Sequence, residues 1–167
     1  MPEVMRGMPY GFRGNVVHHC MADDAIDAAL ERFREFYNTF SAATAPAWLD
    51  RLPEMYAPNF AFEDPFHHVN SDIAKLRSYF ARVAKLPVSK FIVEDIARGS
   101  DGAYVRWRWE WKLRGRGELR VVPGVTHLRF ADNGAITHHR DLFDAARGFY
   151  EALPVVGRVL GAIRKRV

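Results

Sequence analysis

Two polar side chains near the end of the chain have the types and spacing needed for proton transfer. Period-two spacing places His139 and Asp141 on one face of a predicted strand, and Phe143 follows on the same side. If this face points inward, the carboxylate would fix the charge or tautomer of the imidazole and create a group that titrates near neutral pH. The alternative is a structural histidine, with Asp144 and Arg140 paired at the surface.

A second carboxylate stands where the backbone is constrained. Asp64 precedes Pro65, and a residue before proline is pushed toward extended angles, so residues 60–65 are predicted to form a short strand. Glu63 is the neighbour of Asp64 on this strand and should point to the opposite face. Glu63 can therefore serve as an internal control for any role of Asp64.

Tryptophans alternate with charged residues along the segment 103–113. Trp107, Trp109 and Trp111 fall on one face of this predicted strand, where they would either line an aromatic pocket or fill it. An open pocket favours an enzyme or a carrier for a flat apolar molecule. A filled pocket favours a structural or partner-binding module.

Metal and nucleic-acid chemistry find little support in the sequence. The histidine pairs 18–19, 67–68 and 138–139 are each made of adjacent residues, and adjacent strand residues point to opposite faces, so neither a metal site nor a cofactor is predicted. Cys20 is the only cysteine, which excludes an intrachain disulfide. The basic residues after position 97 alternate with apolar ones and lack a phosphate loop or a recognition motif, so we expect solvated strand faces and no nucleic-acid partner.

The elements that must position these side chains follow from periodicity. Helical spacing begins after Asp23, resumes after Thr44 with a break expected at Pro53, and returns in a third helix capped by Ser71. After Pro87 the period changes to two. The predicted strands cover residues 88–97, 103–113, 119–130 and 135–143, with Asp-Gly and Asn-Gly hairpin turns at 101–102 and 133–134. Helices followed by a meander of strands indicate an α+β fold with segregated layers.

The two ends of the chain are treated separately. Residues 1–20 are predicted to form a loosely ordered tail, residues 21–146 the domain, and residues 147–167 a helical extension that is bent near Pro154. The extension carries an apolar stripe and a basic end, which fits docking onto the domain or binding at a membrane surface. No spanning segment or secretory signal is present, so a cytoplasmic protein without stable membrane insertion is expected.

Three segments resemble a known superfamily. The segments EMYAPNFAFEDPF, VVPGVTHLRF and DNGAITHHRDLF, in the predicted order of helices and strands, resemble the NTF2-like superfamily, and within it ketosteroid isomerases and SnoaL-like polyketide cyclases. The resemblance covers residues 24–144. It implies an NTF2-like cone, in which N-terminal helices pack on a strongly curved antiparallel sheet, and a homodimer. We expect Phe33, Phe40, Phe80 and Trp107 inside the cone.

The resemblance also implies roles for individual residues. In the isomerases the Asp of the E-D-P turn is the general base, and Asp64 holds that position, where burial among aromatic rings would raise its proton affinity. Tyr37 matches the first-helix tyrosine that donates to the substrate oxygen, and Thr126 replaces the second donor, an Asp. Asp141 resembles the last-strand acid or base of the cyclases, with His139 assisting. The predicted ligand-contacting residues are Trp107, Phe40, Tyr56, Phe80 and Phe143.

These implications give two functional expectations. The first is a small-molecule enzyme, an isomerase or a cyclase, that moves a proton alpha to a carbonyl of an apolar or polycyclic ligand. The second is a noncatalytic ligand-binding or dimerisation module of the same fold. An open cavity on which Asp64, Tyr37, Thr126, His139 and Asp141 converge would favour the enzyme.

Overall fold

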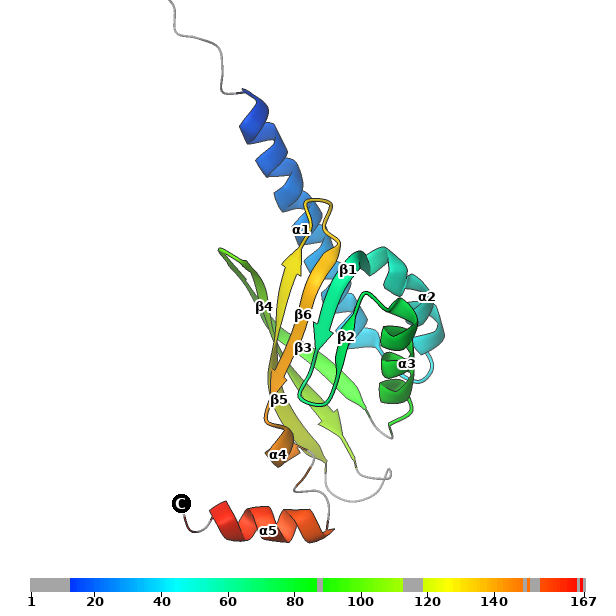
Figure 1. Ribbon diagram of the computed structural model, residues 1–167, viewed down its shortest axis with the longest axis vertical. Coiled ribbons are helices and arrows are strands. Elements are labelled where there is room, and N and C mark those ends of the chain that lie inside the picture. The colour runs from blue at the N-terminus through cyan, green and yellow to red at the C-terminus, as the bar shows by residue number, and fades with distance from the viewer. Residues whose placement is uncertain are drawn as a thin grey trace, which may run out of the picture.

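A computed structural model describes residues 13–86, 89–112, 119–148, 150, 154–164 and 166, and it confirms the predicted α+β order. Three helices and two strands come first: α1 (Arg13–Thr39), α2 (Ala45–Met55), β1 (Tyr56–Glu63), β2 (His68–Asn70) and α3 (Ile73–Ala84). Four long strands follow: β3 (Lys90–Gly99), β4 (Gly102–Trp111), β5 (Arg120–Phe130) and β6 (Ile136–Phe143). Two helices, α4 (Ala145–Gly148) and α5 (Pro154–Arg164), complete the described chain (Figure 1).

The strands form one curled, unclosed sheet in the order β2-β1-β6-β5-β4-β3. Neighbouring strands run antiparallel except for β1 and β6, which pair in parallel with Phe62 opposite His139. The sheet is therefore mixed and not wholly antiparallel as expected. The reason is topological, because β1 and β6 are far apart in sequence and no hairpin joins them, so their relative direction is not fixed by a turn.

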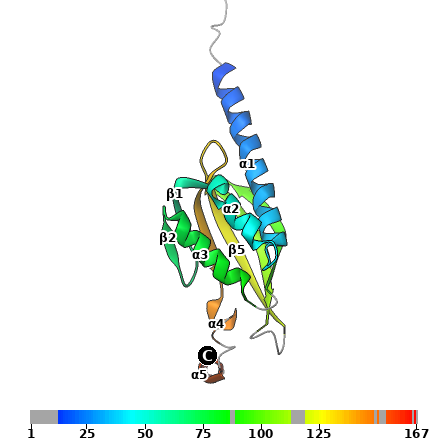
Figure 2. The same cartoon turned by 90° about the vertical axis from the view of Figure 1, so that its right-hand side faces the viewer.

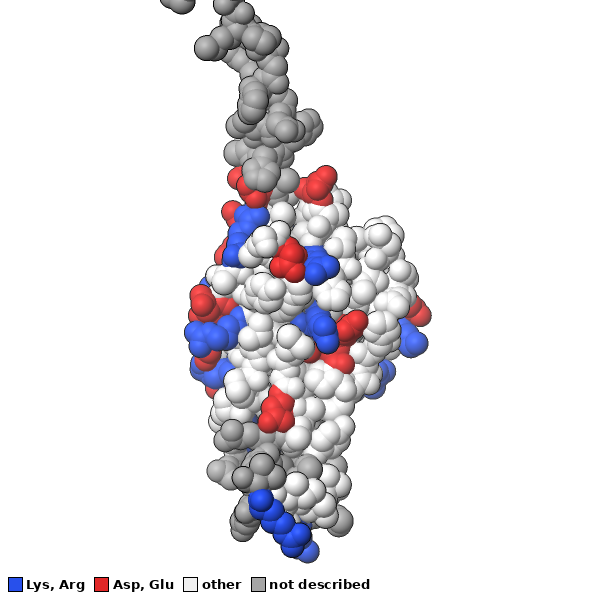
Figure 3. All heavy atoms as spheres, turned by 60° about the vertical axis from the view of Figure 1, so that its left-hand side comes forward, with Lys and Arg blue, Asp and Glu red and all other residues white. Residues whose placement is uncertain are grey.

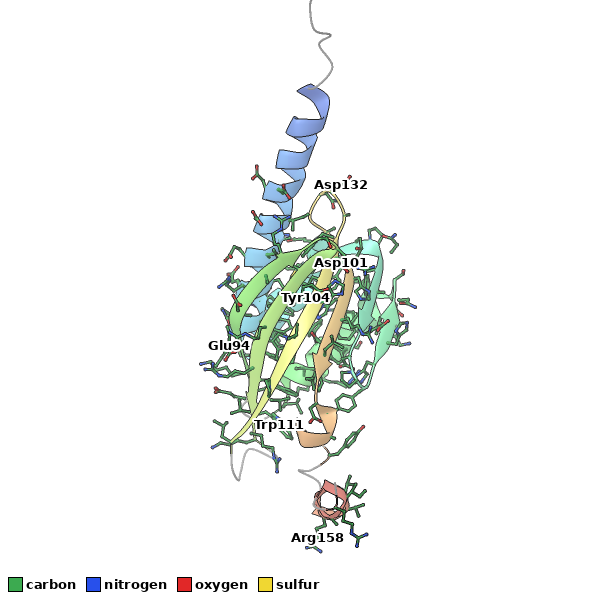
Figure 4. All side chains as sticks on the ribbon, turned by 90° about the vertical axis from the view of Figure 1, so that its left-hand side faces the viewer. Glu94, Asp101, Tyr104, Trp111, Asp132 and Arg158 are labelled. Atoms are coloured by element: carbon green, nitrogen blue, oxygen red, sulfur yellow. The ribbon has the colours of Figure 1, made fainter. Side chains whose placement is uncertain are left out.

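The helices cover one face of the sheet. Figure 2 shows α1, α2 and α3 together on this face, and between the two layers lies the hydrophobic core. Phe33, Phe40, Phe80 and Trp107 are all buried, as the sequence predicted. The opposite face is free of helices among the described residues, and Figure 4 looks onto it with Tyr104 and Glu94 labelled.

Charged residues on the outer face form ion pairs across the strands. Glu94 on β3 lies 3.1 Å from Arg106 and 2.8 Å from Arg108 of β4, and Arg108 also contacts Glu110 at 3.0 Å. Acidic and basic side chains are interspersed on the surface seen in Figure 3. This arrangement agrees with solvated strand faces, the reading favoured by the alternation of charged and apolar residues.

Three helix boundaries differ from the sequence prediction. α1 begins at Arg13 and not near Asp23, so residues 13–20 of the predicted tail are helical; no proline interrupts them. α2 continues through Pro53, because the helix ends two residues later and its buried residues hold it in place. The cap of α3 is Asp72, whose carboxylate accepts from the Lys75 N–H at 2.9 Å, and not Ser71, which adopts a positive φ of 53°.

After the sheet, α4 ends at Gly148 and α5 begins at Pro154, the residue near which the sequence predicted a bend. Pro154 is the first residue of α5, a position at which its missing N–H costs no intrahelical bond. Residues 149 and 151–153, like residues 1–12, lie outside the described residues. No described helix is long and apolar enough to cross a membrane.

Candidate active site

A buried carboxylate is the centre of the candidate site. Asp141 on β6 accepts a hydrogen bond from the Tyr37 hydroxyl of α1, which lies 3.1 Å from both Oδ1 and Oδ2. Thr126 is the cross-strand partner of Asp141 on β5, and its hydroxyl donates to Oδ1 at 2.5 Å. The exposed fractions of Tyr37, Thr126 and Asp141 are 3%, 0% and 7%, so the carboxylate is held by protein groups and not by bulk water.

His139 connects this carboxylate to a second tyrosine. Its Nε2 lies 3.1 Å from Asp141 Oδ1, and its Nδ1 lies 2.6 Å from the Tyr56 hydroxyl. With a proton on Nε2, the ring donates to the carboxylate and accepts from Tyr56, so every group is satisfied. The Tyr37 hydroxyl also lies 3.2 Å from Nε2, so the ring contacts both tyrosines and the carboxylate. These contacts form a chain of hydrogen bonds from Tyr56 through His139 to Asp141.

Trp107 positions Thr126 from the neighbouring strand. Its indole N–H donates to Thr126 Oγ1 at 2.8 Å, which leaves the threonine hydroxyl proton free to point at Asp141. The indole ring lies over Gly124, its cross-strand partner on β5, where a side chain would not fit. Trp107 therefore packs in the core and, through Thr126, helps to position the Asp141 carboxylate.

An open cavity of about 180 Å³ adjoins this network. Asp141 and Trp107 are the two network members that reach it, while Asp64 stands elsewhere on its wall. Most of the remaining wall is aromatic or aliphatic, so the tryptophan stripe lines a pocket in part and does not fill it. The other lining residues are Phe66, His67, Tyr79, Arg82, Val83, Leu86, Phe91, Trp109 and Phe143.

Asp64 lines the cavity, and one of its carboxylate oxygens accepts hydrogen bonds from the backbone of the turn that follows it. Its side chain is 2% exposed, and Oδ1 accepts the backbone N–H groups of Phe66 and His67 at 2.7 and 2.6 Å. The His67 ring adds a contact at 3.1 Å. Glu63 points to the outer face as expected, where it contacts Arg140 and His68.

The predicted site residues divide into two groups. Tyr37, Thr126, His139 and Asp141 are joined in one network, whereas Asp64 lies outside it and shares the cavity wall with Asp141 alone of these four. Their roles stay predictions.

The predicted ligand-contacting residues do not all line the cavity. Trp107 and Phe143 line the cavity, whereas Phe40 and Phe80 line a smaller adjoining space that also touches Asp141. Tyr56 lies behind His139 and away from the cavity lining.

Sequence reasoning missed several cavity residues, and Tyr79 and Phe91 are two of them that helical and strand spacing could have indicated. Tyr79 follows Leu76 by three positions on α3, and Phe91 begins the alternating pattern of β3. Both positions carried a periodic signal but no motif.

Among the described residues, no group of three or more histidine, cysteine, aspartate or glutamate side chains could hold a metal ion.

Three buried tyrosines keep their hydroxyl protons to a higher pH than an ordinary tyrosine does. Burial raises the pKa of Tyr37, Tyr56 and Tyr79 well above the ordinary value, and the nearby Asp141 carboxylate raises each further. The Asp64 carboxylate also raises the pKa of Tyr79, and both residues line the same cavity.

These shifts predict a loss of stability in alkali. Above about pH 10 the unfolded chain ionises these tyrosines while the folded protein keeps them protonated, so the free energy of unfolding falls as pH rises. The slope reaches up to about 1.4 kcal/mol per pH unit for each tyrosine. We expect tyrosinate absorbance to show three of the six tyrosines ionising only on unfolding. Ionisation of all six at their ordinary pKa in the folded protein would contradict this arrangement.

Comparison with known proteins places the fold in a family. A family model described as a SnoaL-like domain matches residues 30–139, and the chain belongs to this family. Its structural neighbours carry NTF2-like, ketosteroid isomerase-like and polyketide cyclase folds. No curated protein matches the sequence.

Three solved structures show how far the likeness extends. A protein of ketosteroid isomerase-like fold from Catenulispora acidiphila DSM 44928, in complex with trimethylamine, is 14% identical with a TM-score of 0.56, covering 72% of this chain and 88% of its own. A candidate SnoaL-like polyketide cyclase from Jannaschia sp. CCS1 is 21% identical with a TM-score of 0.56, covering 70% and 85%. A candidate isomerase from Bacillus subtilis is 15% identical with a TM-score of 0.56, covering 74% and 88%. At these identities the likeness shows the fold alone.

Proposed function

We propose that the protein is an acid–base enzyme that moves a proton at the carbon next to a carbonyl group of a small apolar molecule, with Asp141 as the proton acceptor. The observation that carries this proposal is the position of Asp141, where a fully hydrogen-bonded buried network meets an apolar cavity. Polar groups converging on an apolar pocket are the usual mark of an active site.

The two oxygens of Asp141 have different surroundings. Oδ1 receives the Thr126 hydroxyl and the His139 ring, whereas the Tyr37 hydroxyl is the described donor within reach of Oδ2. Oδ2 therefore keeps a lone pair for a substrate proton. In this arrangement Tyr37 and Thr126 hold the base, which differs from the oxyanion role that the family resemblance implied for them.

A different group has to stabilise the negative charge that develops on the substrate oxygen. Tyr79 lines the cavity, and its raised pKa keeps its hydroxyl a proton donor. A hydrogen bond from such a hydroxyl to an enolate oxygen strengthens as charge develops. We therefore assign Tyr79 as the oxyanion donor in this proposal, a role in which its single O–H turns from the Asp64 carboxylate to the substrate oxygen.

The volume of the cavity favours a small substrate. Ligand pockets for drug-sized molecules are typically about 300–1,000 Å³, and this one is about 180 Å³. The wall offers aromatic faces from Trp107, Trp109 and Phe91. A flat ligand of one or two rings fits these walls better than a four-ring steroid.

A second candidate function is noncatalytic binding of a small organic cation. Aromatic faces combined with carboxylates attract such cations, and this cavity has both in Trp107, Trp109, Asp64 and Asp141. The relative from Catenulispora acidiphila was solved with trimethylamine. Tight binding of an alkylammonium ion, with no turnover of any carbonyl compound, would favour this function over the enzyme.

The two cavity carboxylates should differ in their effect on turnover. In Asp64→Asn the amide oxygen can still accept the Phe66 and His67 N–H groups, so the turn is kept and the rate should fall by about tenfold or less. The matched control Glu63→Gln removes a charge from the outer face and should leave the rate unchanged. The assay is turnover of a panel of β,γ-unsaturated ketones and polyketide-like esters. A loss larger in Asp64→Asn than in Asp141→Asn would make Asp64 the base.

The homodimer expected from the family resemblance also stays a prediction. The described part of α5 does not cover the sheet, and the outer face exposes Tyr104, Val121 and Leu142 between its ion pairs (Figure 4). An uncovered sheet face of this kind is suited to pairing with a second copy.

A further inference from the structure

The helix α5 presents apolar side chains to solvent. Val156, Val159 and Ile163 are 39%, 55% and 56% exposed. Their spacing of three and four residues places them on one face of the helix. Such a face is normally buried in a soluble domain, so it calls for a partner.

The same segment is strongly basic. Residues 152–167 contain three arginines and one lysine and no acidic residue. Arg158 and Arg166 are exposed, and Figure 4 shows Arg158 extending away from the sheet. Figure 3 shows a group of basic side chains at this end of the molecule. An apolar face combined with cations and no anions is the composition of a helix that lies in the interface of an anionic membrane.

The cavity lies at the same end of the molecule. It is lined by Phe66 after β1, by Arg82 near the end of α3 and by Phe143 at the end of β6. These element ends face α4 and α5 in Figure 1. Tyr150, in the segment that leads to α5, contacts Phe66 with 5.9 Å between ring centroids. A surface bound by α5 would therefore lie beside the entrance to an apolar cavity.

We propose that α5 binds the surface of anionic phospholipid membranes and holds the cavity entrance next to the lipid. The eleven residues of α5 are too short to span a bilayer, so the helix lies in the interface. Anionic lipid attracts the cations, and Val156, Val159 and Ile163 enter the acyl boundary. Docking onto the same chain is not seen for this face among the described residues.

The proposal is tested by co-sedimentation of the full chain with vesicles. We expect at least about tenfold more protein bound to an equal mixture of phosphatidylglycerol and phosphatidylcholine than to phosphatidylcholine alone, with binding weakened by salt. The double variant Val159→Asp, Ile163→Asp should lose this binding. The matched control Leu142→Asp changes a residue of similar exposure, 47%, on the outer sheet face and should bind like the wild type.

Three results would overturn the proposal. The first is wild-type binding no stronger to anionic than to neutral vesicles. The second is unchanged vesicle binding by the double variant, with loss only in Arg158→Glu, because a purely electrostatic contact is what a nucleic acid would make. The third is a lower molecular mass of the double variant in light scattering without any effect on vesicles, which would assign the face to a second copy. None of these measurements depends on catalytic activity, so they are independent of the proposed reaction.

Discussion

Asp141→Asn should reduce kcat/KM by about 100- to 10,000-fold, the range that a positioned general base contributes. The amide has nearly the same size as the carboxylate but cannot act as a general base. Thr126 and Tyr37 still have an amide oxygen to which they can donate, so the protein should fold. Turnover is measured on the carbonyl panel, with circular dichroism and thermal unfolding to confirm the fold.

The control for this variant is Asp144→Asn, a change of the same type at an exposed position three residues along the chain. It should leave the rate unchanged, because Asp144 does not line the cavity. Tyr37→Phe provides a second comparison, because it removes a donor to Asp141 and keeps the base. A normal rate in folded Asp141→Asn would exclude Asp141 as the proton acceptor.

Gly124→Ala should destabilise the protein by about 3 kcal/mol, the upper end of the range for overpacking a buried site. A Cβ atom at this position would lie 2.3–2.7 Å from three ring carbons of Trp107, which is far inside van der Waals contact. The indole is rigid and 1% exposed, so it has no room to retreat. Its movement would also break the bond to Thr126 and loosen Asp141.

The measurement for this variant is the urea midpoint, followed by tryptophan fluorescence, together with turnover. Gly99→Ala is the matched control, since its Cβ would meet only the edge of the exposed Tyr104 ring at 3.2 Å, a contact that a small shift of this ring relieves. A Gly124→Ala protein with wild-type stability would show that Trp107 does not occupy the position described.

Local pattern was sufficient to predict most of the fold. The change from helical to period-two spacing near Pro87 separated the helical layer from the four long strands, because each spacing exposes one apolar face to the same core. Asn133 and Gly134 marked a turn that the structure has, with a φ of 80° at the glycine. The parallel pairing of β1 with β6 could not be predicted from spacing, since it joins segments that no turn connects.

The candidate site was predictable where two of its residues share one strand. His139 and Asp141 follow each other with period two, so their common face was visible in the sequence. Tyr79 was not predicted, because an aromatic residue at helical spacing reads as core. Its place in the cavity wall depends on how α3 packs against the sheet, which local spacing does not determine.

Asp64 lines the cavity, but its hydrogen bonds could not be predicted from the E-D-P motif. The E-D-P turn aimed its side chain at the cavity, as the family resemblance implied. The hydrogen bonds from the Phe66 and His67 backbone could not be foreseen, since they depend on the turn that connects β1 with β2. β2 itself has only three residues, too few to show a period.

The central claim is that Asp141 removes a proton next to a carbonyl group inside the cavity, and solvent deuterium exchange tests it most directly. Each ketone or ester of the panel is incubated with the protein in deuterium oxide, and deuterium at the carbon next to the carbonyl is followed by proton NMR. We predict exchange with the wild-type protein and with Glu63→Gln, and none above background with Asp141→Asn. Exchange at the same rate with folded Asp141→Asn, or binding of panel compounds to the wild type with no exchange in any of them, would contradict the account.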